Sequence, residues 1–596
     1  MIERFCFLFL LVSLSGFAQT LSGRLPADTT LDAASSPWTI SSTVTVPDGI
    51  TLSIEAGCIV YLAENAAIQV ERGGCLKALG DSTQRICLTR LPDTDDRWAG
   101  ISFEHSMENN IISYTDMTYG DAGGELILVD HSRLLLDFCT WNSTNKTIVE
   151  VEHPSLVIQH CLFPRVDEVE VIHGTYLRDD EYLILMGNTF GPPLGYNDVI
   201  DFTDCKLPGP IFQAYNNTFL GGGDDGLDLD GADAHIEGNV FMNFHKGHSG
   251  SSTSNAIATG VRNGKTSDIT VVRNLFYDND HAVLLKEKCW LHAENNTFVK
   301  SDSAVINFSE WPYRNVEPGK GAYLDGNIFW HYGQVFENWT AQPGQTDPTI
   351  IIHNSIIAEH LTDLGQGNFA ADPQFVNPPE DFHLQATSPA KGAGPDGLDM
   401  GAYVPQGATV SGELPDTTTE TSARFFVGGP GITHYRFALQ SPKQWSEVFE
   451  IKEHPTIELR ELQPGYSYTV YVQGRNVAGR WQTSPEFATS KTWHVVSSET
   501  SVEKAAARVE EFCVYPAYPN PFNATTQVRY AVPHRARISL LLFDARGRNV
   551  RTLFQGEQST GRHRVRISAD NLSTGVYYVE LRSGNVRRRT RVLLIR

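Results

Sequence analysis

The chain repeats a short pattern: LMGNTF at 185–190, AYNNTF at 214–219 and IEGNVF at 236–241. It continues as VVRNLF (271–276), AENNTF (293–298), LDGNIF (324–329) and IIHNSI (351–356), so the repeated asparagines are Asn188, Asn217, Asn239, Asn274, Asn296, Asn327 and Asn354. Upstream, LDFCTW (136–141) and IQHCLF (158–163) place Cys139 and Cys161 in the same position. A step of 22 residues recurs among longer ones, which is typical of a coil of constant length with loops of variable length.

Each repeat alternates apolar and polar residues as a β-strand does and lacks helical periodicity. We therefore predict an all-β protein whose body is a parallel β-helix. In such a solenoid an inward asparagine bonds to the backbone of the bend and stacks on its equivalent in the next coil, ~4.8 Å away. Cysteine fits this position as a small apolar group, so we expect Cys139 and Cys161 to stack rather than to form a disulfide.

The remaining cysteines carry less information. The sequence does not decide the disulfide state of Cys58, Cys75, Cys87, Cys205 and Cys289. No CxxC pair occurs, so we expect no zinc site of the usual cysteine spacing.

The repeat resembles the asparagine ladder of the pectate-lyase-like superfamily, which consists of right-handed parallel β-helices. Residues 370–403 resemble the last coils of many bacterial members, and the stretch that begins TLDAASSPW (30–38) resembles their first coils. The resemblance implies a right-handed solenoid over residues 31–403.

Two small β-sandwich domains are predicted after the solenoid. Residues 408–490 contain alternating strands, and their string LQPGYSYTV (462–470) resembles a fibronectin type III domain in which Tyr468 is a buried structural residue. Residues 491–511 have the composition of a linker.

Residues 512–596 form the last predicted module, a β-sandwich of about seven short strands. Its strings YPNPF (518–522) and GVYY (575–578), together with the apolar end at 592–595, resemble the type A C-terminal sorting domain of the type IX secretion system. The module departs from that family in being rich in Arg where Lys is usual. The resemblance implies that the type IX machinery carries the protein across the outer membrane and that the domain is then removed, with surface attachment or release.

The chain begins with a predicted secretory signal peptide, residues 1–18. An apolar run over 5–12 follows one Arg, and the small residues Gly16 and Ala18 come next. No later stretch reaches ~18 apolar residues, so we expect no membrane anchor and a secreted or outer-membrane surface location.

Charge narrows the choice of partner. The whole chain carries −23, but residues 512–596 contain fifteen Arg against four acids, a net +11, so the rest carries −34. An acidic body argues against nucleic acid as its partner. The classes of partner that remain compatible with this charge are cations, neutral glycans and acidic glycans bridged by calcium.

The acidic residues gather where the predicted coils are aligned by their strands. The five aligned strands are NDVIDFT (197–203), DDGLDLD (224–230), SNAIATG (254–260), DHAVLLK (280–286) and DSAVINF (302–308). The first two place Asp198 beside Asp225 and Asp201 beside Asp228. Carboxylates stacked at ~4.8 Å repel one another strongly without a proton or a counter-ion. Calcium suits such a site because it accepts about six to eight oxygens in loose geometry. We therefore predict a calcium site at Asp198, Asp201, Asp224, Asp225 and Asp228.

Two enzyme families resemble this cluster. Family 9 polysaccharide lyases hold calcium on a DDGxD string, which matches Asp224 to Asp228, together with an Asp one coil earlier. They place a Lys base on the next strand, where this chain has Ala258. The candidates to replace it lie in the flanking loop and are Lys246, Lys265, His245 and His248.

Family 28 glycoside hydrolases, the polygalacturonases, offer the other resemblance. Asp198, Asp224 and Asp225 match their three carboxylates, and Lys286 matches their Lys. Asn255 stands in place of their His, unless His248 substitutes, and Leu284 stands in place of their Arg. Neither catalytic set is complete, so the sequence leaves open whether the protein is an enzyme.

Structural interpretations compete with these. The acidic cluster can be a structural calcium site or a solvated turn, and Lys286 can be a rim residue that neutralises Asp280 and its neighbours. His245, His248 and His281 can be loop or surface residues. Trp311 and Tyr313, like Trp290, Trp330 and Tyr332, suit either sugar stacking or ordinary packing.

The leading functional hypothesis is an exported protein that binds extracellular acidic polysaccharide at a calcium site. If a base is in place, it would cleave that polysaccharide by β-elimination. The alternatives are a non-catalytic structural or adhesive solenoid and a polygalacturonase-like hydrolase.

Overall fold

The computed structural model describes residues 19–192, 195–246, 254–412, 414–497 and 511–595. The predicted signal peptide, residues 1–18, and His248 lie outside the described residues. The chain divides into two compact units, residues 1–495 and 496–596. Among the described residues, no helix has the length and apolar character needed to cross a membrane.

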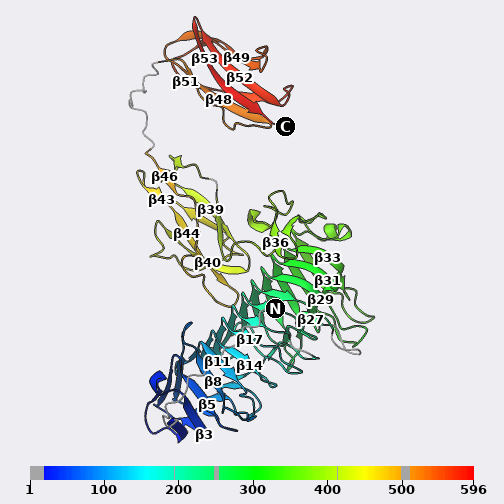
Figure 1. Ribbon diagram of the computed structural model, residues 1–596. Helices are drawn as coiled ribbons and strands as arrows, with labels where there is room; N and C mark the ends of the chain where they lie inside the picture. The colour runs from blue at the N-terminus through cyan, green and yellow to red at the C-terminus, as the bar shows by residue number, and fades with distance from the viewer. Residues whose placement is uncertain (1–18, 193–194, 247–253, 413, 498–510, 596) are drawn as a thin grey trace. The chain divides into compact units, whose positions relative to one another are not determined.

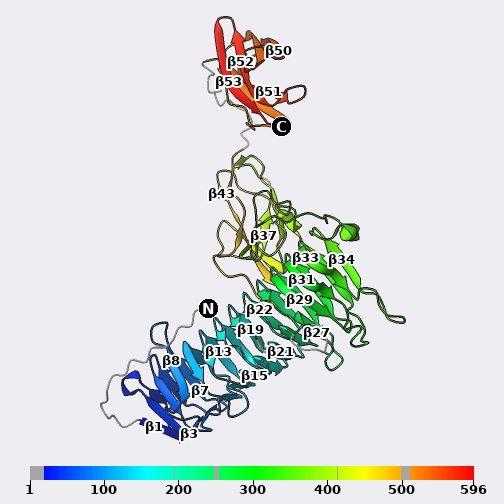
Figure 2. The ribbon, with the colours of Figure 1, turned by 45° about the vertical axis from the view of Figure 1, so that its right-hand side comes forward.

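The first unit is built on a parallel β-solenoid whose strands follow one another along one axis (Figure 1). One face is a thirteen-stranded parallel sheet, part of which is visible in Figure 2. Its strands are β2 (Thr29–Leu31), β4 (Thr51–Glu55), β7 (Cys75–Leu79), β10 (Asn110–Ser113), β13 (Arg133–Asp137), β16 (Ser155–Gln159), β19 (Tyr182–Met186), β22 (Phe212–Tyr215), β25 (Ala234–Glu237), β28 (Asp268–Val272), β30 (Trp290–Glu294), β32 (Gly321–Asp325) and β34 (Thr349–His353).

A second sheet of 21 strands forms two further columns that merge in its long strands. One column contains β5 (Ile59–Leu62), β8 (Ile86–Arg90), β11 (Thr115–Thr118), β14 (Thr140–Asn142), β17 (Leu162–Phe163), β20 (Thr189–Phe190), β23 (Thr218–Phe219) and β26 (Val240–Met242). The other contains β6 (Ile68–Val70), β9 (Ile101–Glu104), β12 (Ile127–Asp130), β15 (Val149–Glu152), β18 (Ile172–Thr175), β21 (Ile200–Thr203), β24 (Leu227–Asp230) and β27 (Asn255–Gly260). The long strands are β1 (Gln19–Arg24), β3 (Trp38–Val46), β29 (Leu275–Leu285), β31 (Thr297–Asn307) and β33 (Ile328–Glu337). Pairing begins at β1, ahead of the predicted start at 31.

Parallel register places equivalent residues of successive coils directly above one another, which explains the repeat. The Phe of each Asn-x-Phe pattern, and Phe163 of the equivalent Cys161-Leu162-Phe163, stack on one another inside the solenoid. Ring centroids lie 4.6–5.1 Å apart from Phe163 to Phe329. Trp141 begins the stack, 4.4 Å from Phe163. The predicted all-β parallel solenoid is therefore confirmed.

The predicted asparagine ladder is also present, and its members are buried. The Asn217 backbone N–H and Nδ2 donate to Asn239 Oδ1 at 2.8 and 2.9 Å, and Asn239 donates in the same way to Asn274. Nδ2 of Asn239 also donates to the carbonyl of Ala214, one coil back. Each amide thus satisfies backbone groups at the bend that burial would otherwise leave unpaired.

The two ends of the ladder differ in chemistry. Cys139 and Cys161 are buried and free, and the Cys139 N–H donates to Cys161 Sγ at 3.4 Å, so the predicted stacking is confirmed.

The assignment of Asn354 to the ladder is wrong. Ser355 occupies the position and accepts the Asn327 N–H through Oγ at 3.1 Å. Both Asn-Ser-Ile and Ser-Ile-Ile fit the sequence pattern, and the pairing of Ile328 with Ile356 decides between them.

Short elements close the solenoid, and a small sandwich completes the first unit. The closing elements are η2 (Glu359–Leu364), β35 (Phe375–Asn377), β36 (Asp381–Leu384) and η3 (Pro395–Gly397), and η1 (Ala33–Ser35) lies in the first coil. The sandwich contains β37 (Thr409–Ser411), β38 (Thr417–Thr418), β39 (Ala423–Gly428), β40 (Ile432–Leu439), β41 (Phe449–Glu450), β42 (Thr456–Leu459), β43 (Ser467–Tyr468), β44 (Val470–Asn476), β45 (Ala488–Thr489) and β46 (Trp493–Val495). Tyr468 is buried, and its hydroxyl accepts the Gln463 N–H at 2.8 Å.

The second unit is a sandwich of two antiparallel sheets. Its described strands are β47 (Cys513–Val514), β48 (Thr525–Val532), β49 (Ala536–Asp544), β50 (Asn549–Gln558), β51 (Gly561–Ser568), β52 (Gly575–Ser583) and β53 (Val586–Leu594). Alternating residues such as Val528, Leu540 and Leu581 form its core.

Candidate functional site

The acidic cluster lies on consecutive coils at β21 and β24. Asp201 pairs with Asp228, so the strand alignment predicted from the sequence is confirmed there. Leu227 and Leu229 alternate with Asp228 and Asp230 along β24 and are buried. The leucines therefore face the core, and the two carboxylates lie on the outer face of the strand.

Three carboxylates meet at the corner that precedes these strands. Asp198 Oδ1 accepts the Asp225 N–H at 3.1 Å, and Asp225 Oδ1 accepts the Asn255 N–H and Nδ2 at 3.0 and 2.7 Å. Asp224 completes the group, in which one carboxylate oxygen from each residue lies within 4.8 Å of the others. Asp198 and Asp225 thus each bind the backbone of the following coil through one carboxylate oxygen.

Burial is the main cause of the unusual electrostatics at this corner. It raises the pKa of Asp198 and of Asp225 well above the ordinary value, and the neighbouring carboxylates add to the effect. Burial also raises the pKa of Asp224 to about 6, although Lys286 nearby acts in the opposite direction. Removing three like charges from water without a partner is costly, so the corner favours protons or a cation.

A second group of charges adjoins this corner. Burial raises the pKa of Asp201 and Asp228 to about 6 and that of Asp230 to about 7. Oδ1 of Asp228 and Oδ1 of Asp230 are buried without a hydrogen-bond partner in the described structure. These atoms offer oxygen ligands to a cation bound at the cluster.

Lys286 neutralises part of this second group. Burial by itself lowers its pKa, but the carboxylates of Asp228, Asp230 and Glu310 outweigh burial and raise it. Its Nζ lies 3.6 Å from Glu310 Oε1. The prediction that Lys286 neutralises Asp280 is wrong. The carboxylates that raise the pKa of Lys286 most are those of Asp228, Asp230 and Glu310, whereas Asp280 accepts hydrogen bonds from His245 Nδ1 and from the Lys246 N–H, both at 2.8 Å.

Gly260 explains why Lys286 reaches the cluster. It lies in the coil between Asp230 and Lys286, and a Cβ there would overlap Asp230 Oδ1 and lie 2.7 Å from Lys286 Cε. The missing side chain leaves the space that the lysine crosses. Gly260 was not identified from the sequence, although its position between an Asp and a Lys in the aligned strands is the signal that could have identified it.

The candidate bases are found in different places. Lys265 Nζ lies 3.0 Å from Asp204 Oδ1, which holds it in an ion pair outside the cluster. Lys246 lies over the ring of Tyr313, 4.7 Å from its centroid. Ala258 pairs with Asp228 on one side and with Leu284 on the other, so no base lies at that strand position.

Two further sequence predictions need correction. His281 is not a surface residue, because its exposed fraction is 1% and its Nε2 lies 2.9 Å from Glu337 Oε2. The fifth aligned strand is also displaced by one residue. The register shifts between Asn279 and His281, so Leu284 pairs with Asn307 rather than with Ile306.

The loop after β31 connects the cluster with the predicted aromatic residues. Glu310, which pairs with Lys286, is directly followed by Trp311, and both Trp311 and Tyr313 are exposed. Arg314 Nη1 lies 3.5 Å from Glu310 Oε2. Glu310 was missed in the sequence because its position depends on how this loop folds back on the solenoid.

The raised pKa values predict how stability depends on pH. A carboxyl whose pKa is higher in the folded than in the unfolded protein adds stability below its unfolded value, and this contribution is lost as the pH rises through the folded value. For Asp228 and Asp230 the window runs from 3.8 to about 6 and 7. Without calcium, thermal unfolding should therefore show lower stability at pH 8 than at pH 5. The loss over this range should be about 1.4 kcal/mol for Asp228, whose folded pKa of about 6 lies one unit above pH 5.

Histidines whose pKa is raised in the folded protein also lose a stabilising charge between pH 5 and pH 8. The variant Asp228→Asn/Asp230→Asn separates the contribution of the two aspartates from theirs. It should flatten the profile, and calcium should restore wild-type stability at pH 8. An equally steep profile in the variant would contradict the assignment.

One family model matches the chain. Residues 516–596 match the secretion system C-terminal sorting domain. The sorting domain predicted from the sequence is thus confirmed, and the protein is secreted or displayed at the cell surface. No curated protein matches the chain.

Solved structures show partial likeness. The chain is similar to the BSP domain of a biofilm-associated protein, at 12% identity over 31% of this chain and 29% of that one, with a TM-score of 0.11. It is similar to a mutant tailspike protein of E. coli bacteriophage HK620 in complex with a pentasaccharide, at 11% identity over 80% and 84%, with a TM-score of 0.32. A two-domain fibronectin type III segment of chicken tenascin matches at 13% identity over 32% and 99%, with a TM-score of 0.11. The chain spans less than a third of the biofilm-associated domain.

Proposed function

We propose that this exported solenoid binds calcium at the acidic cluster and, through the calcium ion, an extracellular acidic polysaccharide. The observation that carries the proposal is the meeting of Asp198, Asp224 and Asp225, whose carboxylate oxygens lie within 4.8 Å of one another. Asp201 and Asp228 would complete the ligand set from the adjoining strands.

The donor set fits calcium. These predicted ligands supply only carboxylate oxygens, which suit calcium or magnesium better than zinc or copper. Calcium tolerates irregular geometry, whereas magnesium demands a near-octahedral site. A divalent ion would also relieve the repulsion among the carboxylates, one of which, Asp224, has its pKa raised to about 6.

The proposed glycan class follows from the same charges. A cation held by aspartates can bridge to a carboxylate of a uronate, because calcium retains positions for further oxygen ligands. Exposed Trp311 and Tyr313 could cover apolar faces of sugar rings beside the ion, and Lys246 lies over Tyr313. An acidic polymer alone would be repelled by the cluster, so binding should require calcium.

The arrangement supports binding better than cleavage. The strand position of the lyase base is Ala258, Lys265 is paired with Asp204, and Lys286 is surrounded by carboxylates that keep it protonated. A base must lose its proton to act. The alternative is a structural or adhesive solenoid that binds calcium but no polysaccharide. It differs from the proposal only in that the bound calcium ion does not go on to bind a glycan.

A hydrolase is the second candidate. Carboxyls with raised pKa values are suited to act as general acids near neutral pH. Inverting hydrolysis needs two carboxyls about 6.5–9.5 Å apart with room for water, whereas the oxygens of Asp198, Asp224 and Asp225 lie within 4.8 Å. A screen for reducing and unsaturated products from polyuronides separates hydrolysis, elimination and simple binding.

Calcium titration by calorimetry tests the proposal. The wild-type protein should bind calcium in the micromolar range, and Asp224→Asn/Asp225→Asn should abolish binding while circular dichroism stays unchanged. Asp179→Asn/Asp180→Asn, an exposed adjacent pair, removes the same two charges elsewhere and should bind as wild type does. Folded wild-type protein that binds no calcium would eliminate the calcium and lyase proposals. Retention on polygalacturonate only with calcium then distinguishes glycan binding from a structural calcium site.

A further inference from the structure

An acid–histidine pair recurs at the ends of three consecutive strands, away from the acidic cluster. Glu104-His105 ends β9, Asp130-His131 ends β12 and Glu152-His153 ends β15. The register pairs Asp130 with Glu104 on one side and with Glu152 on the other. A column of three carboxylates therefore runs beside a column of three imidazoles, and the proposed calcium site uses neither.

The backbone turns all three histidines in the same way. His105, His131 and His153 have φ values of 60°, 45° and 52°, in the left-handed region. Their rings consequently stack along the solenoid. Centroids of His105 and His131 lie 4.8 Å apart with planes inclined by 14°, and those of His131 and His153 lie 4.5 Å apart.

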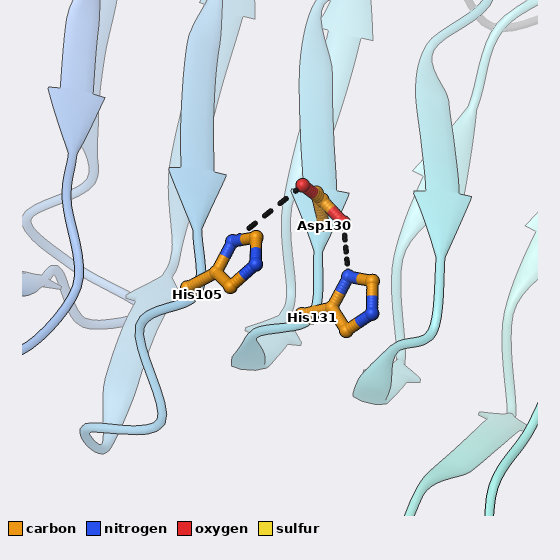
Figure 3. A group of neighbouring side chains, drawn as sticks. All are labelled: His105, Asp130 and His131. Atoms are coloured by element: carbon orange, nitrogen blue, oxygen red, sulfur yellow. Dashed lines mark hydrogen bonds and ion pairs between the residues drawn. The ribbon is translucent and has the colours of Figure 1, made fainter.

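Two of the imidazoles face one carboxylate. His131 Nδ1 lies 2.5 Å from Asp130 Oδ1, and His105 Nδ1 lies 3.7 Å from Asp130 Oδ2 (Figure 3). One ligand atom from each of the three residues lies within 4.8 Å of the others. The side chains of His105, Asp130 and His131 are 44%, 27% and 30% exposed, so an ion from solvent can reach them.

The third imidazole, that of His153, packs against the ring of His131. His153 has a side-chain exposure of only 8%, and its Nδ1 lies 3.0 Å from Glu181 Oε2. It is therefore held in place and packs against the ring of His131. With His105 on the other face, the His131 ring lies between two neighbours that limit its rotation, and its Nδ1 remains directed at Asp130.

We propose that His105, Asp130 and His131 form a binding site for a first-row divalent transition-metal ion, with zinc as the probe. Two imidazole nitrogens and a carboxylate oxygen suit zinc, nickel or copper rather than calcium. Ligand atoms at Zn–N and Zn–O lengths of about 2.1 Å lie roughly 3.4 Å apart around a tetrahedral ion. His105 Nδ1 is already near this separation from Asp130 Oδ2, at 3.7 Å, whereas His131 Nδ1, at 2.5 Å from Oδ1, has to move outward when an ion replaces the hydrogen bond. The ion replaces any proton held between Asp130 and the two Nδ1 atoms, and water fills its remaining positions.

The ligands come from consecutive coils and not from one local string, so cysteine-type spacing rules do not detect them. The site also stands apart from the calcium proposal in both chemistry and residues. The competing arrangement is a metal-free pair of imidazole–carboxylate contacts. That arrangement predicts no zinc affinity beyond what any single histidine–aspartate pair provides.

Zinc titration of the full exported protein in saturating calcium tests the site. His131→Asn should weaken zinc binding at least tenfold, since it removes one of three ligands. Asn is chosen because it tolerates a positive φ. His160→Asn is the matched control. His160 also has a positive φ and its Nδ1 lies 3.0 Å from Asp137, but it belongs to a single pair.

The expected result is one zinc ion bound by wild type and by His160→Asn, with cobalt giving the absorption bands of a nitrogen–oxygen site in both and not in His131→Asn. Asp224→Asn/Asp225→Asn should bind zinc as wild type does, whatever its calcium affinity. The proposal is overturned if wild type binds no zinc, or if His131→Asn and His160→Asn bind it equally while circular dichroism shows both folded.

Discussion

Replacing Asn239 by alanine is expected to lower the free energy of unfolding by roughly 3–5 kcal/mol. Asn239 accepts two hydrogen bonds from Asn217 and donates to the Ala214 carbonyl and to Asn274, all of them buried. Alanine leaves these groups unpaired at a bend that water does not reach, and each unpaired group costs about 1–3 kcal/mol. Urea unfolding followed by circular dichroism measures the loss.

Asn142→Ala is the control for this change. Asn142 lies in β14 of the same solenoid but is exposed, so its replacement should stay within about 0.5 kcal/mol of wild type. A loss of similar size in both variants would show that the ladder contributes no more than surface asparagines do. A loss confined to Asn239→Ala would show that the buried amides hold the coils in register.

Replacing Lys286 by methionine should destabilise the calcium-free protein by about 3–5 kcal/mol at pH 8, the usual loss when one partner of a buried ion pair is removed. Methionine has a similar length and fills the space above Gly260, so the loss reports charge rather than volume. Asp228, Asp230 and Glu310 would then face one another without the charge of Lys286. The effect should shrink at pH 5, where the pKa values of about 6 and 7 for Asp228 and Asp230 leave both protonated.

Lys288→Met provides the comparison, because Lys288 is exposed two residues away. It should change stability little at either pH. Adding Asp230→Asn to Lys286→Met should recover part of the loss, which a double-mutant cycle quantifies. If Lys286→Met were equally destabilising at pH 5 and pH 8, the lysine would act through packing and not through the carboxylates.

Much of the fold could be predicted because, in a parallel solenoid, residues at equivalent positions of successive coils are in contact. The recurring Asn-x-Phe pattern predicts both the ladder and, through its Phe, the interior aromatic stack. The same relation between spacing and contact correctly places Asp201 beside Asp228. Prediction failed where the spacing was ambiguous, as at Ser355, or where a register shift entered β29 and β31.

The site was only partly predictable for a related reason. Strand positions such as Asp228 and Ala258 follow from the alignment of the coils, but loop residues do not. Glu310 reaches Lys286 only because the loop after β31 folds back onto the solenoid. Lys246 meets Tyr313 instead of the cluster for the same kind of reason.

The sequence by itself determined the coil, its interior ladder, the acidic columns and the sorting domain, because each depends on residue type and on spacing over one coil. Only the tertiary structure decided which basic side chain interacts with which carboxylate. Lys286 crosses the gap at Gly260 to reach Asp228 and Asp230, while Asp280 is held by His245. It also decided that His105 and His131 turn toward Asp130, since that depends on left-handed backbone at two successive corners. Corner geometry and loop packing arise from contacts between coils, and no single stretch of sequence specifies them.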